Sequence, residues 1–328
     1  MSASGNRVWF QIILAFAAAL SSGFSVAQSQ DQSKEEKEEK DLTISVDVRR
    51  VVLYATVRDA KLASLVGDLK QEDFSIRDNG HPEQIRQFKR EDVPVAIGLI
   101  LDNSQSMMTK RNEVIGAAKT FVQTSNPHDE MFVLHFSDDL RLGLPPDVPF
   151  TSDHPMLEQA LERITAMGRT ALYDGILAGL RHLQESKLTK KALVVISDGG
   201  DNASLAKFPD LVKAAGISGA LFYGIGIYDP LDGDAKPGVI RHLASETGGA
   251  SFFPQSVEEV TGLCESIARD LRNQYMLEYA PESDSKDASF HKVEVRVKDP
   301  KHRRLIIRTR TGYYGPAAER GFWEKLPK

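Results

Sequence analysis

The chain of 328 residues has a single cysteine, Cys264, which excludes an intramolecular disulfide bond. Cys264 falls in an apolar stripe, so we interpret it as a buried, unreactive thiol. The chain also lacks an excess of positive charge, with 41 lysine and arginine residues against 46 aspartate and glutamate residues. This balance gives no electrostatic reason to expect nucleic acid as a partner. The one dense basic cluster, residues 301–304, lies between two strand-like segments and is interpreted as a solvated hairpin turn.

The apolar run near the start of the chain is shorter than the roughly 20 residues that a membrane-spanning helix needs. It covers about residues 8–20, follows a positive charge at Arg7 and precedes a small-residue stretch that ends at Ala27. This layout is typical of a secretory signal peptide cleaved after Ala27, with an uncleaved membrane anchor as the alternative. No cysteine follows the run, so a bacterial lipoprotein anchor is not supported. We therefore expect an exported protein, either periplasmic or secreted.

Strand-like patterns occur near both ends of the remaining chain. Residues 42–92 and 273–316 alternate apolar and polar side chains with period 2. The turn signal Asp-Asn-Gly at 78–80 predicts a hairpin between residues 74–76 and 85–88. Each segment alone has few strands and little core, so we predict that the two pair into one β-sandwich-like module.

Between these segments the pattern changes to short, continuous apolar runs that alternate with amphipathic helical patterns. Such runs are typical of strands buried on both faces. Their alternation with helices predicts an α/β fold, a doubly wound and mostly parallel sheet with helices on both faces. The apolar runs are 95–101, 131–136, 192–197 and 220–228, and the helical patterns are 111–125, 154–167, 171–186, 208–218, 236–247 and 256–273. The expected segments are a signal peptide at 1–27, a disordered charged linker at 28–41, an N-terminal β segment at 42–92, an α/β domain at 93–272, a C-terminal β segment at 273–316 and a tail at 317–328.

Small oxygen-bearing side chains follow the first of the buried runs. Asp102, Ser104 and Ser106 occupy alternate positions there, and in an open α/β sheet ligands bind beyond the carboxyl ends of the strands. Two further oxygen donors are available, since Asp198 directly follows a later buried run and Thr170 precedes a helical pattern. Carboxylate and hydroxyl oxygens suit Mg²⁺ or Ca²⁺, and no cysteine or histidine stands beside the motif to favour zinc.

This constellation resembles the von Willebrand factor A-type domain, whose metal-ion-dependent adhesion site has Asp-x-Ser-x-Ser followed by a distant Thr and a distant Asp. All five positions are filled in order, by Asp102, Ser104, Ser106, Thr170 and Asp198. The stretches "VRDAKLASLVGDLKQEDFSIRDNG" and "TRTGYYGP" resemble a bacterial subgroup of exported proteins with a related domain.

The resemblance has consequences for metal, partner and dynamics. It implies that the five residues hold Mg²⁺, with Ca²⁺ or Mn²⁺ as substitutes. It implies that an Asp or Glu carboxylate of a protein partner completes the coordination, bound by the loops around Asp102, Thr170 and Asp198. It also implies a coupling between the site and the last helix of the domain, here near 256–273.

Enzymatic functions lack supporting residues around this motif. A Mg²⁺-dependent phosphoryl-transfer enzyme using Asp102 usually has a further acid nearby, and Ser104 stands two positions on instead. A serine hydrolase needs a Gly-x-Ser-x-Gly turn, which neither Ser104 nor Ser106 occupies. We therefore expect a binding protein that is not an enzyme. A structural envelope protein whose metal only stabilises the loops is the alternative.

The neighbours of these residues are interpreted as structural. Asp102 could itself be a helix N-cap, but the presence of Thr170 and Asp198 favours the metal site. Asp201 and Asn202 are expected to shape the turn that follows the second acid. The two methionines at 107–108 are expected to pack under the loop of the Asp-x-Ser-x-Ser motif.

Overall fold

The computed structural model describes residues 50–163, 167–228, 236–281 and 287–326. The predicted signal peptide and charged linker lie outside the described residues, as does the beginning of the N-terminal β segment. Within the described ranges, no helix combines the length and apolar content that crossing a bilayer requires.

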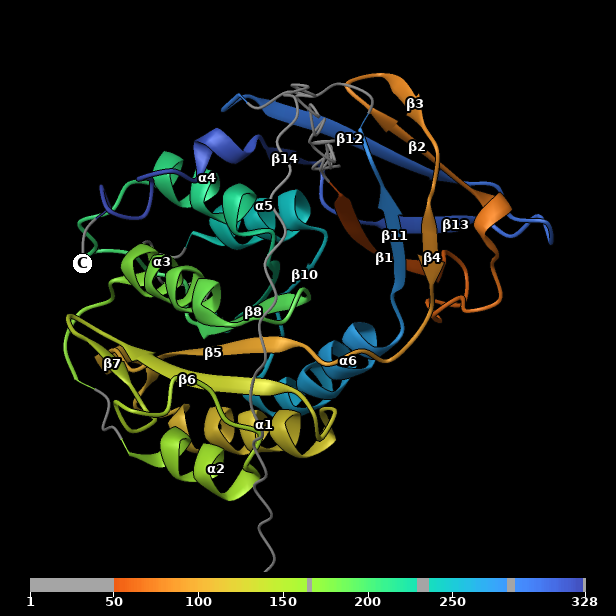
Figure 1. Cartoon of the computed structure of the whole chain (residues 1–328). Coiled ribbons are helices and arrows are strands. Elements are labelled where there is room, and N and C mark those ends of the chain that lie inside the picture. The colour runs from red at the N-terminus through yellow and green to blue at the C-terminus, as the bar shows by residue number, and fades with distance from the viewer. Residues whose placement is uncertain (1–49, 164–166, 229–235, 282–286, 327–328) are drawn as a thin grey trace, which may run out of the picture. The chain divides into compact units, whose positions relative to one another are not determined.

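The centre of the described chain is a six-stranded sheet (Figure 1). In spatial order its strands are β10 (Ala250–Phe252), β9 (Leu221–Gly226), β8 (Lys191–Ser197), β5 (Ala96–Asp102), β6 (Glu130–Phe136) and β7 (Leu140–Leu142). Every neighbouring pair is parallel except β6 and β7. The four central strands are the four predicted apolar runs, and nearly all their side chains are buried because helices cover both faces.

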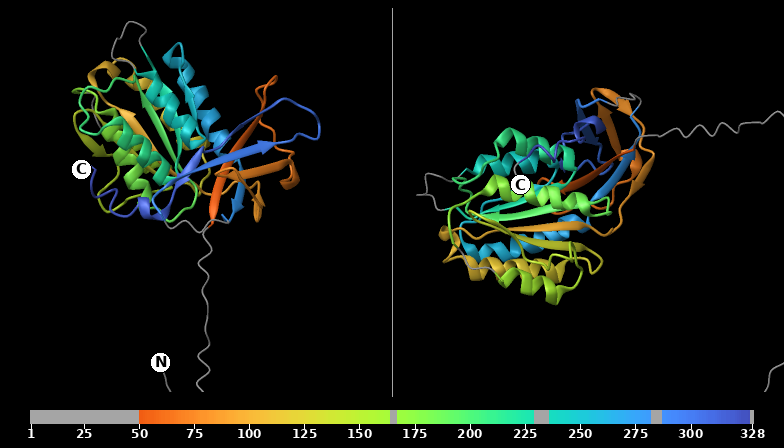
Figure 2. Two further views of the ribbon diagram at one scale, coloured as in Figure 1. Left: turned by 90° about the horizontal axis from the view of Figure 1, so that it is seen from above. Right: turned by 60° about the vertical axis from the view of Figure 1, so that its left-hand side comes forward.

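Helices cover the two faces of this sheet, as Figures 1 and 2 show. One face carries α3 (Leu172–His182), α4 (Phe208–Ser218) and α5 (Pro237–Thr247), and the other carries α1 (Arg111–Thr124), α2 (His154–Glu162) and α6 (Val260–Arg272). Short 3₁₀ turns occupy Gln71–Asp73, Gln105–Met107, Leu183–Glu185, Val257–Glu259 and Pro316–Ala318. The predicted α/β fold with a mostly parallel, doubly wound sheet is therefore confirmed. Helix α2 ends earlier than predicted, at Glu162 rather than residue 167, where the backbone N–H of Met167 instead donates to Asn103.

Two further sheets, both antiparallel, are built from strands of the two terminal segments. The first has the order β13 (Leu305–Arg308), β1 (Val51–Asp59), β11 (Tyr275–Tyr279) and β4 (Gln87–Lys89). The second has the order β14 (Gly312–Tyr314), β12 (Phe290–Val297), β2 (Phe74–Asp78) and β3 (His81–Glu83). Both sheets contribute to one apolar core, which includes Leu53, Ile76 and Tyr275 and is separate from the core of the α/β part. The exact domain boundaries stay predictions.

The hairpin predicted in the N-terminal β segment has a different second strand. Asn79 and Gly80 both have positive φ angles, of 48° and 85°, and form a two-residue turn. This turn pairs Asp78 with His81, so β3 is the partner of β2. Residues 87–89 form β4 in the other antiparallel sheet, beside β11, and the predicted pairing of 85–88 with 74–76 is wrong.

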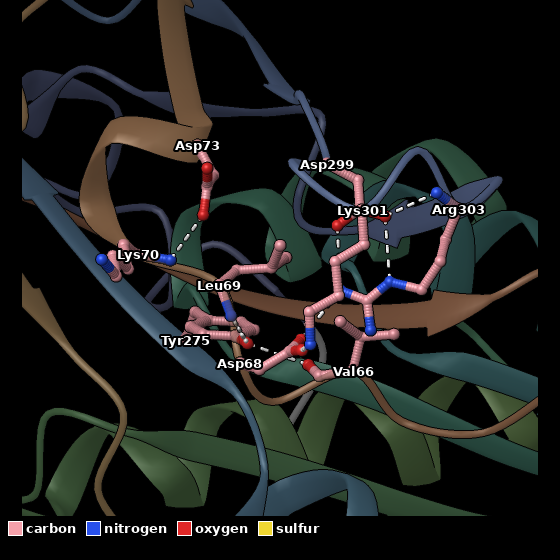
Figure 3. Close-up of polar contacts among 9 residues, drawn as sticks. All are labelled: Val66, Asp68, Leu69, Lys70, Asp73, Tyr275, Asp299, Lys301 and Arg303. Atoms are coloured by element: carbon pink, nitrogen blue, oxygen red, sulfur yellow. Dashed lines mark hydrogen bonds and ion pairs between the residues drawn. The ribbon is translucent and has the colours of Figure 1, made fainter.

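The basic cluster at 301–304 is likewise not a hairpin turn, because β12 and β13 belong to different sheets. It contributes two cations to a surface ion-pair network (Figure 3). Lys301 and Arg303 both pair with Asp68, and Arg303 also pairs with Asp299 at 2.9 Å. Both contacts of Arg303 have the geometry of hydrogen-bonded ion pairs. Charge-assisted hydrogen bonds therefore hold the segment between β12 and β13 in place.

A buried acid joins helix α6 to the antiparallel sheet that contains β1. The carboxylate of Asp270 accepts hydrogen bonds from Arg58 on β1, at 2.6 Å, and from Arg308 on β13. The side chain of Asp270 is 1% exposed, while both arginines are about three-quarters buried. We call these three residues the Asp270 clamp.

Lys190 is a buried lysine in contact with a carbonyl oxygen and an aromatic ring. It is 2% exposed, its Nζ donates to the carbonyl oxygen of Leu271, and it lies 4.9 Å from the ring centre of Tyr54. Burial lowers the pKa of Lys190 from 10.5 to about 8. Between these values the unfolded chain holds a proton that the folded chain has released, so the free energy of unfolding rises with pH.

We therefore expect denaturant titrations to show the stability of the wild type, relative to that of the Lys190→Met variant, rising from about pH 8 to about pH 10. From about pH 9 the buried thiol of Cys264, whose pKa burial raises to about 12, opposes this rise in both proteins. Above that range tyrosines such as Tyr223, whose pKa burial raises, reverse the trend. The Lys190→Met variant should lack the rise. An equal pH slope in the two proteins would contradict this assignment.

Candidate functional site

The candidate metal site begins where two neighbouring parallel strands end. Asp102 is the last residue of β5, and Asp198 follows Ser197, the last residue of β8. Because β5 and β8 pair in parallel, these ends meet at one edge of the sheet. Ser197 Oγ donates to Asp102 Oδ2 at 2.6 Å and joins the two strand ends. Ser197 was not predicted as part of the site. Its position, a hydroxyl at the end of a buried strand and next to the second acid, could have indicated it.

The loop after Asp102 brings the motif's two hydroxyls together. The backbone N–H of Ser104 donates to Asp102 Oδ1 at 2.8 Å, which fixes the carboxylate and the start of the loop. A short 3₁₀ turn follows and places Ser104 Oγ 3.0 Å from Ser106 Oγ. Ser104 is buried and Ser106 is exposed. The motif therefore presents one fixed carboxylate and two adjacent hydroxyls.

Thr170 lies in a loop that is hydrogen-bonded to both of the others. Gly168 accepts from the backbone N–H of Gln105 at 3.1 Å, which joins this loop to the Asp102 loop. The backbone N–H of Thr170 donates to Asn202 Oδ1 at 3.0 Å, and Thr170 O accepts from the N–H of Asn202. Thr170 is 4% exposed. The structure thus brings the loops of all five predicted residues to one edge of the sheet, and Asn202 joins two of them.

Two buried carboxylates lie close together at this edge. Asp102 and Asp198 are 3% and 4% exposed. Burial, and next the negative charge of Asp198, raise the pKa of Asp102 to about 6, although hydrogen bonds from Ser104 and Ser197 oppose this shift. A divalent cation between the two acids would compensate both charges. The electrostatics therefore fit a cation site.

The donor set also indicates which cation fits. Among the described residues no group of three or more His, Cys, Asp or Glu side chains is placed to hold a metal. The remaining donors at this edge are hydroxyls, which are neutral oxygen ligands of the kind that Mg²⁺ and Ca²⁺ accept. A set of two carboxylates and three hydroxyls fits a hard cation better than zinc.

The turn after Asp198 is packed against Tyr228. Gly199 has a φ of +82°, and a Cβ there would lie 1.9 Å from the Tyr228 ring. Burial and the charge of Asp198 raise the pKa of Tyr228. This close approach, which only glycine permits, holds the second acid beside its strand and was not predicted from the sequence.

Comparisons with known proteins give a family match for part of the chain and a similarity of fold. Residues 97–200 match the sequence model of the von Willebrand factor type A domain. A structure described as von Willebrand factor type A from Catenulispora acidiphila is 12% identical, with a TM-score of 0.50 over 87% of this chain and 78% of that chain. At this identity the likeness shows the fold alone.

Two other solved structures are similar at lower TM-scores. BatB from Bacteroides thetaiotaomicron is 18% identical, with a TM-score of 0.45 over 55% of this chain and 100% of that chain. Proximal thread matrix protein 1 from the mussel byssus, with a zinc-occupied MIDAS motif, is 16% identical, with a TM-score of 0.48 over 59% of this chain and 49% of that chain. No curated protein matches the sequence. Residues 97–200 therefore match the von Willebrand factor type A domain in sequence, and the α/β part that contains them is similar in fold to a solved structure of that type.

Proposed function

We propose that the chain is an exported binding protein whose von Willebrand factor type A domain captures a protein partner through a divalent cation. Asp102, Ser104, Ser106, Thr170 and Asp198 hold the cation, which is Mg²⁺ with Ca²⁺ or Mn²⁺ as substitutes. A carboxylate of an Asp or Glu side chain of the partner completes the coordination. The observation that supports this best is the pair of buried carboxylates at one sheet edge, beside adjacent hydroxyls.

The roles of the residues follow from their charges. The two acids balance the cation, and the hydroxyls coordinate without adding charge, so the cation keeps its attraction for a further anionic oxygen. Without the cation, two uncompensated acids would repel a carboxylate partner. Binding is therefore metal-dependent and involves no covalent chemistry. Von Willebrand factor type A domains are in general interaction modules rather than enzymes.

The remaining features of the proposal concern the rest of the chain. Residues 1–27 direct export and are removed, so that the protein is periplasmic or secreted and meets a membrane only if this segment is retained. Residues 42–92 and 273–316 form one module around the inserted domain at 93–272. This arrangement is supported by the pairing of β1 with β11 and β13.

Isothermal titration calorimetry tests the proposed cation site. Mg²⁺ and Ca²⁺ are titrated into the chelator-treated chain from residue 28 onward, with acetate present as a stand-in for the partner's carboxylate. We expect saturable binding at one site. The Asp139→Asn variant, which removes an exposed acid near the same sheet edge, should bind equally well. A chain that binds neither cation would contradict the proposal and favour a scaffold role for the domain.

A further inference from the structure

Exposed large apolar side chains are few in the described part of the chain, and three of them lie on the loops of the candidate site. Among the described residues, seven large apolar side chains are exposed: Leu62, Met108, Leu142, Met167, Leu205, Phe290 and Ile306. Three of these, Met108, Met167 and Leu205, are 61%, 69% and 78% exposed. They lie respectively on the loops that follow Asp102, precede Thr170 and follow Asp198. We call these three side chains the apolar rim.

The backbone of the apolar rim is held in place. The N–H of Met167 donates to the carbonyl oxygen of Asn103 at 2.8 Å, and that of Met108 donates to Gln105 at 3.2 Å. The N–H of Leu205 donates to Asp174 Oδ2 at 2.8 Å. Hydrogen-bonded loops therefore present these side chains to solvent from fixed backbone positions. Burial in a partner would remove their apolar surface from water.

A pocket beside the apolar rim offers further room for a partner. It has a volume of about 230 Å³, and its lining includes Asn103, Arg141, Met167 and Gly168. Asn103 is the neighbour of Asp102, so the pocket adjoins the candidate site. A side chain next to the partner's acid could enter it.

The charges of the three loops suit an acidic partner rather than a basic one. Lys110, Arg169 and Lys207 stand on these loops against Asp201, the one acid there outside the site. The adjacent loop after β6 and the pocket lining add Asp138, Asp139 and Arg141. Arg169 is paired with Asp138 at 2.9 Å. When a divalent cation balances the two site acids, this edge carries no excess of negative charge, which makes it complementary to a carboxylate.

We propose that the apolar rim selects the partner, and that the favoured partner is a protein presenting one Asp or Glu between apolar side chains. This inference rests on the proposed function, since the cation captures the acid while the rim contacts its neighbours. Exposed acids are common on protein surfaces, so the cation alone would discriminate poorly. An acid flanked by apolar residues is rarer, and the rim supplies the corresponding selectivity.

Selection from a library of displayed random peptides tests the inference. The library is bound to the full chain in Mg²⁺ and eluted with a chelator. We expect the selected peptides to share an Asp or Glu flanked by Leu, Ile, Met or Phe. A synthetic consensus peptide should bind about tenfold more tightly than the same peptide with its apolar residues replaced by serine. Combining Met108→Ser, Met167→Ser and Leu205→Ser in one variant should remove this difference.

A matched control variant and a measurement of Mg²⁺ binding distinguish failure of the apolar rim from failure of the cation site. The variant with Leu62→Ser and Ile306→Ser loses two similarly exposed apolar side chains away from the site and should keep the preference. If the selected peptides contain an acid without apolar neighbours, or if the triple variant still prefers the consensus peptide over its serine version, the proposed role of the apolar rim is wrong. The proposed function would still stand. Selected peptides without an acid, or no enrichment at all, would overturn the inference. Calorimetric binding of Mg²⁺ by the same protein then shows whether the cation site fails too.

Discussion

The Asp102→Ala variant is expected to lose saturable Mg²⁺ binding and, with it, metal-dependent partner binding. The substitution removes one of the two acids and the acceptor for both Ser104 N–H and Ser197 Oγ. The remaining acid, Asp198, cannot balance a divalent cation alone. Calorimetry on the chelator-treated proteins measures the loss directly. Thermal unfolding gives a second readout, because Mg²⁺ should raise the midpoint of the wild type and leave that of the variant unchanged.

The same substitution should leave the fold intact. Burial and Asp198 together raise the pKa of Asp102, so the metal-free protein carries an unfavourable pair of acids that the variant no longer has. In the presence of chelator, Asp102→Asn, which keeps the shape of the side chain, should unfold at least as late as the wild type. Saturable Mg²⁺ binding by Asp102→Ala at wild-type strength would show that these residues do not form the site.

The core of the fold was predictable because its pattern has a simple cause. Strands β5, β6, β8 and β9 lie between two helical layers, so both faces of each strand need apolar residues and the runs are continuous. The predicted run at 95–101 differs from β5, residues 96–102, by one residue at each end. The helices were predicted from their strong apolar periodicity over long segments, except that α2 ends earlier than predicted.

The edges of the sheets were not predictable in the same way. Strands β3, β4, β7 and β10 have three residues each, too few to show any period. The partner of β2 was assigned wrongly because the apolar residues at 85–88 suggested a strand, whereas the two-residue turn selects the polar segment directly after it. Turn geometry, rather than side-chain pattern, decides this register.

At the candidate site, the sequence supplied the order and chemistry of the donors but not their surroundings. The two methionines of the motif loop show the difference. Met107 is 1% exposed, as expected, and Met108 is 61% exposed, contrary to the expectation that both pack under the loop. Met107 is the last residue of the 3₁₀ turn and Met108 follows it, and consecutive residues there point in different directions, so composition alone cannot separate them. The metal role of the five residues stays a prediction.

Breaking the Asp270 clamp from the arginine side is expected to cost about 3–5 kcal/mol of unfolding free energy. The variant with Arg58→Met and Arg308→Met leaves the Asp270 carboxylate, 1% exposed, without either of its cations. Denaturant unfolding near pH 7 measures the loss as a lower midpoint. The Asp270→Asn variant should lose less, because the two arginines are partly exposed and can turn toward water.

The control for the clamp lies one residue away on the same helix. Arg269 pairs with Glu265 at 3.6 Å, and both side chains are well exposed, so Arg269→Met should cost less than about 1 kcal/mol. A double arginine variant no less stable than this control would show that the clamp contributes nothing. If the expected loss is found, α6 is held to β1 and β13 by a buried charge. The helix movement that the family resemblance implies would then have to break the clamp or shift that sheet with it.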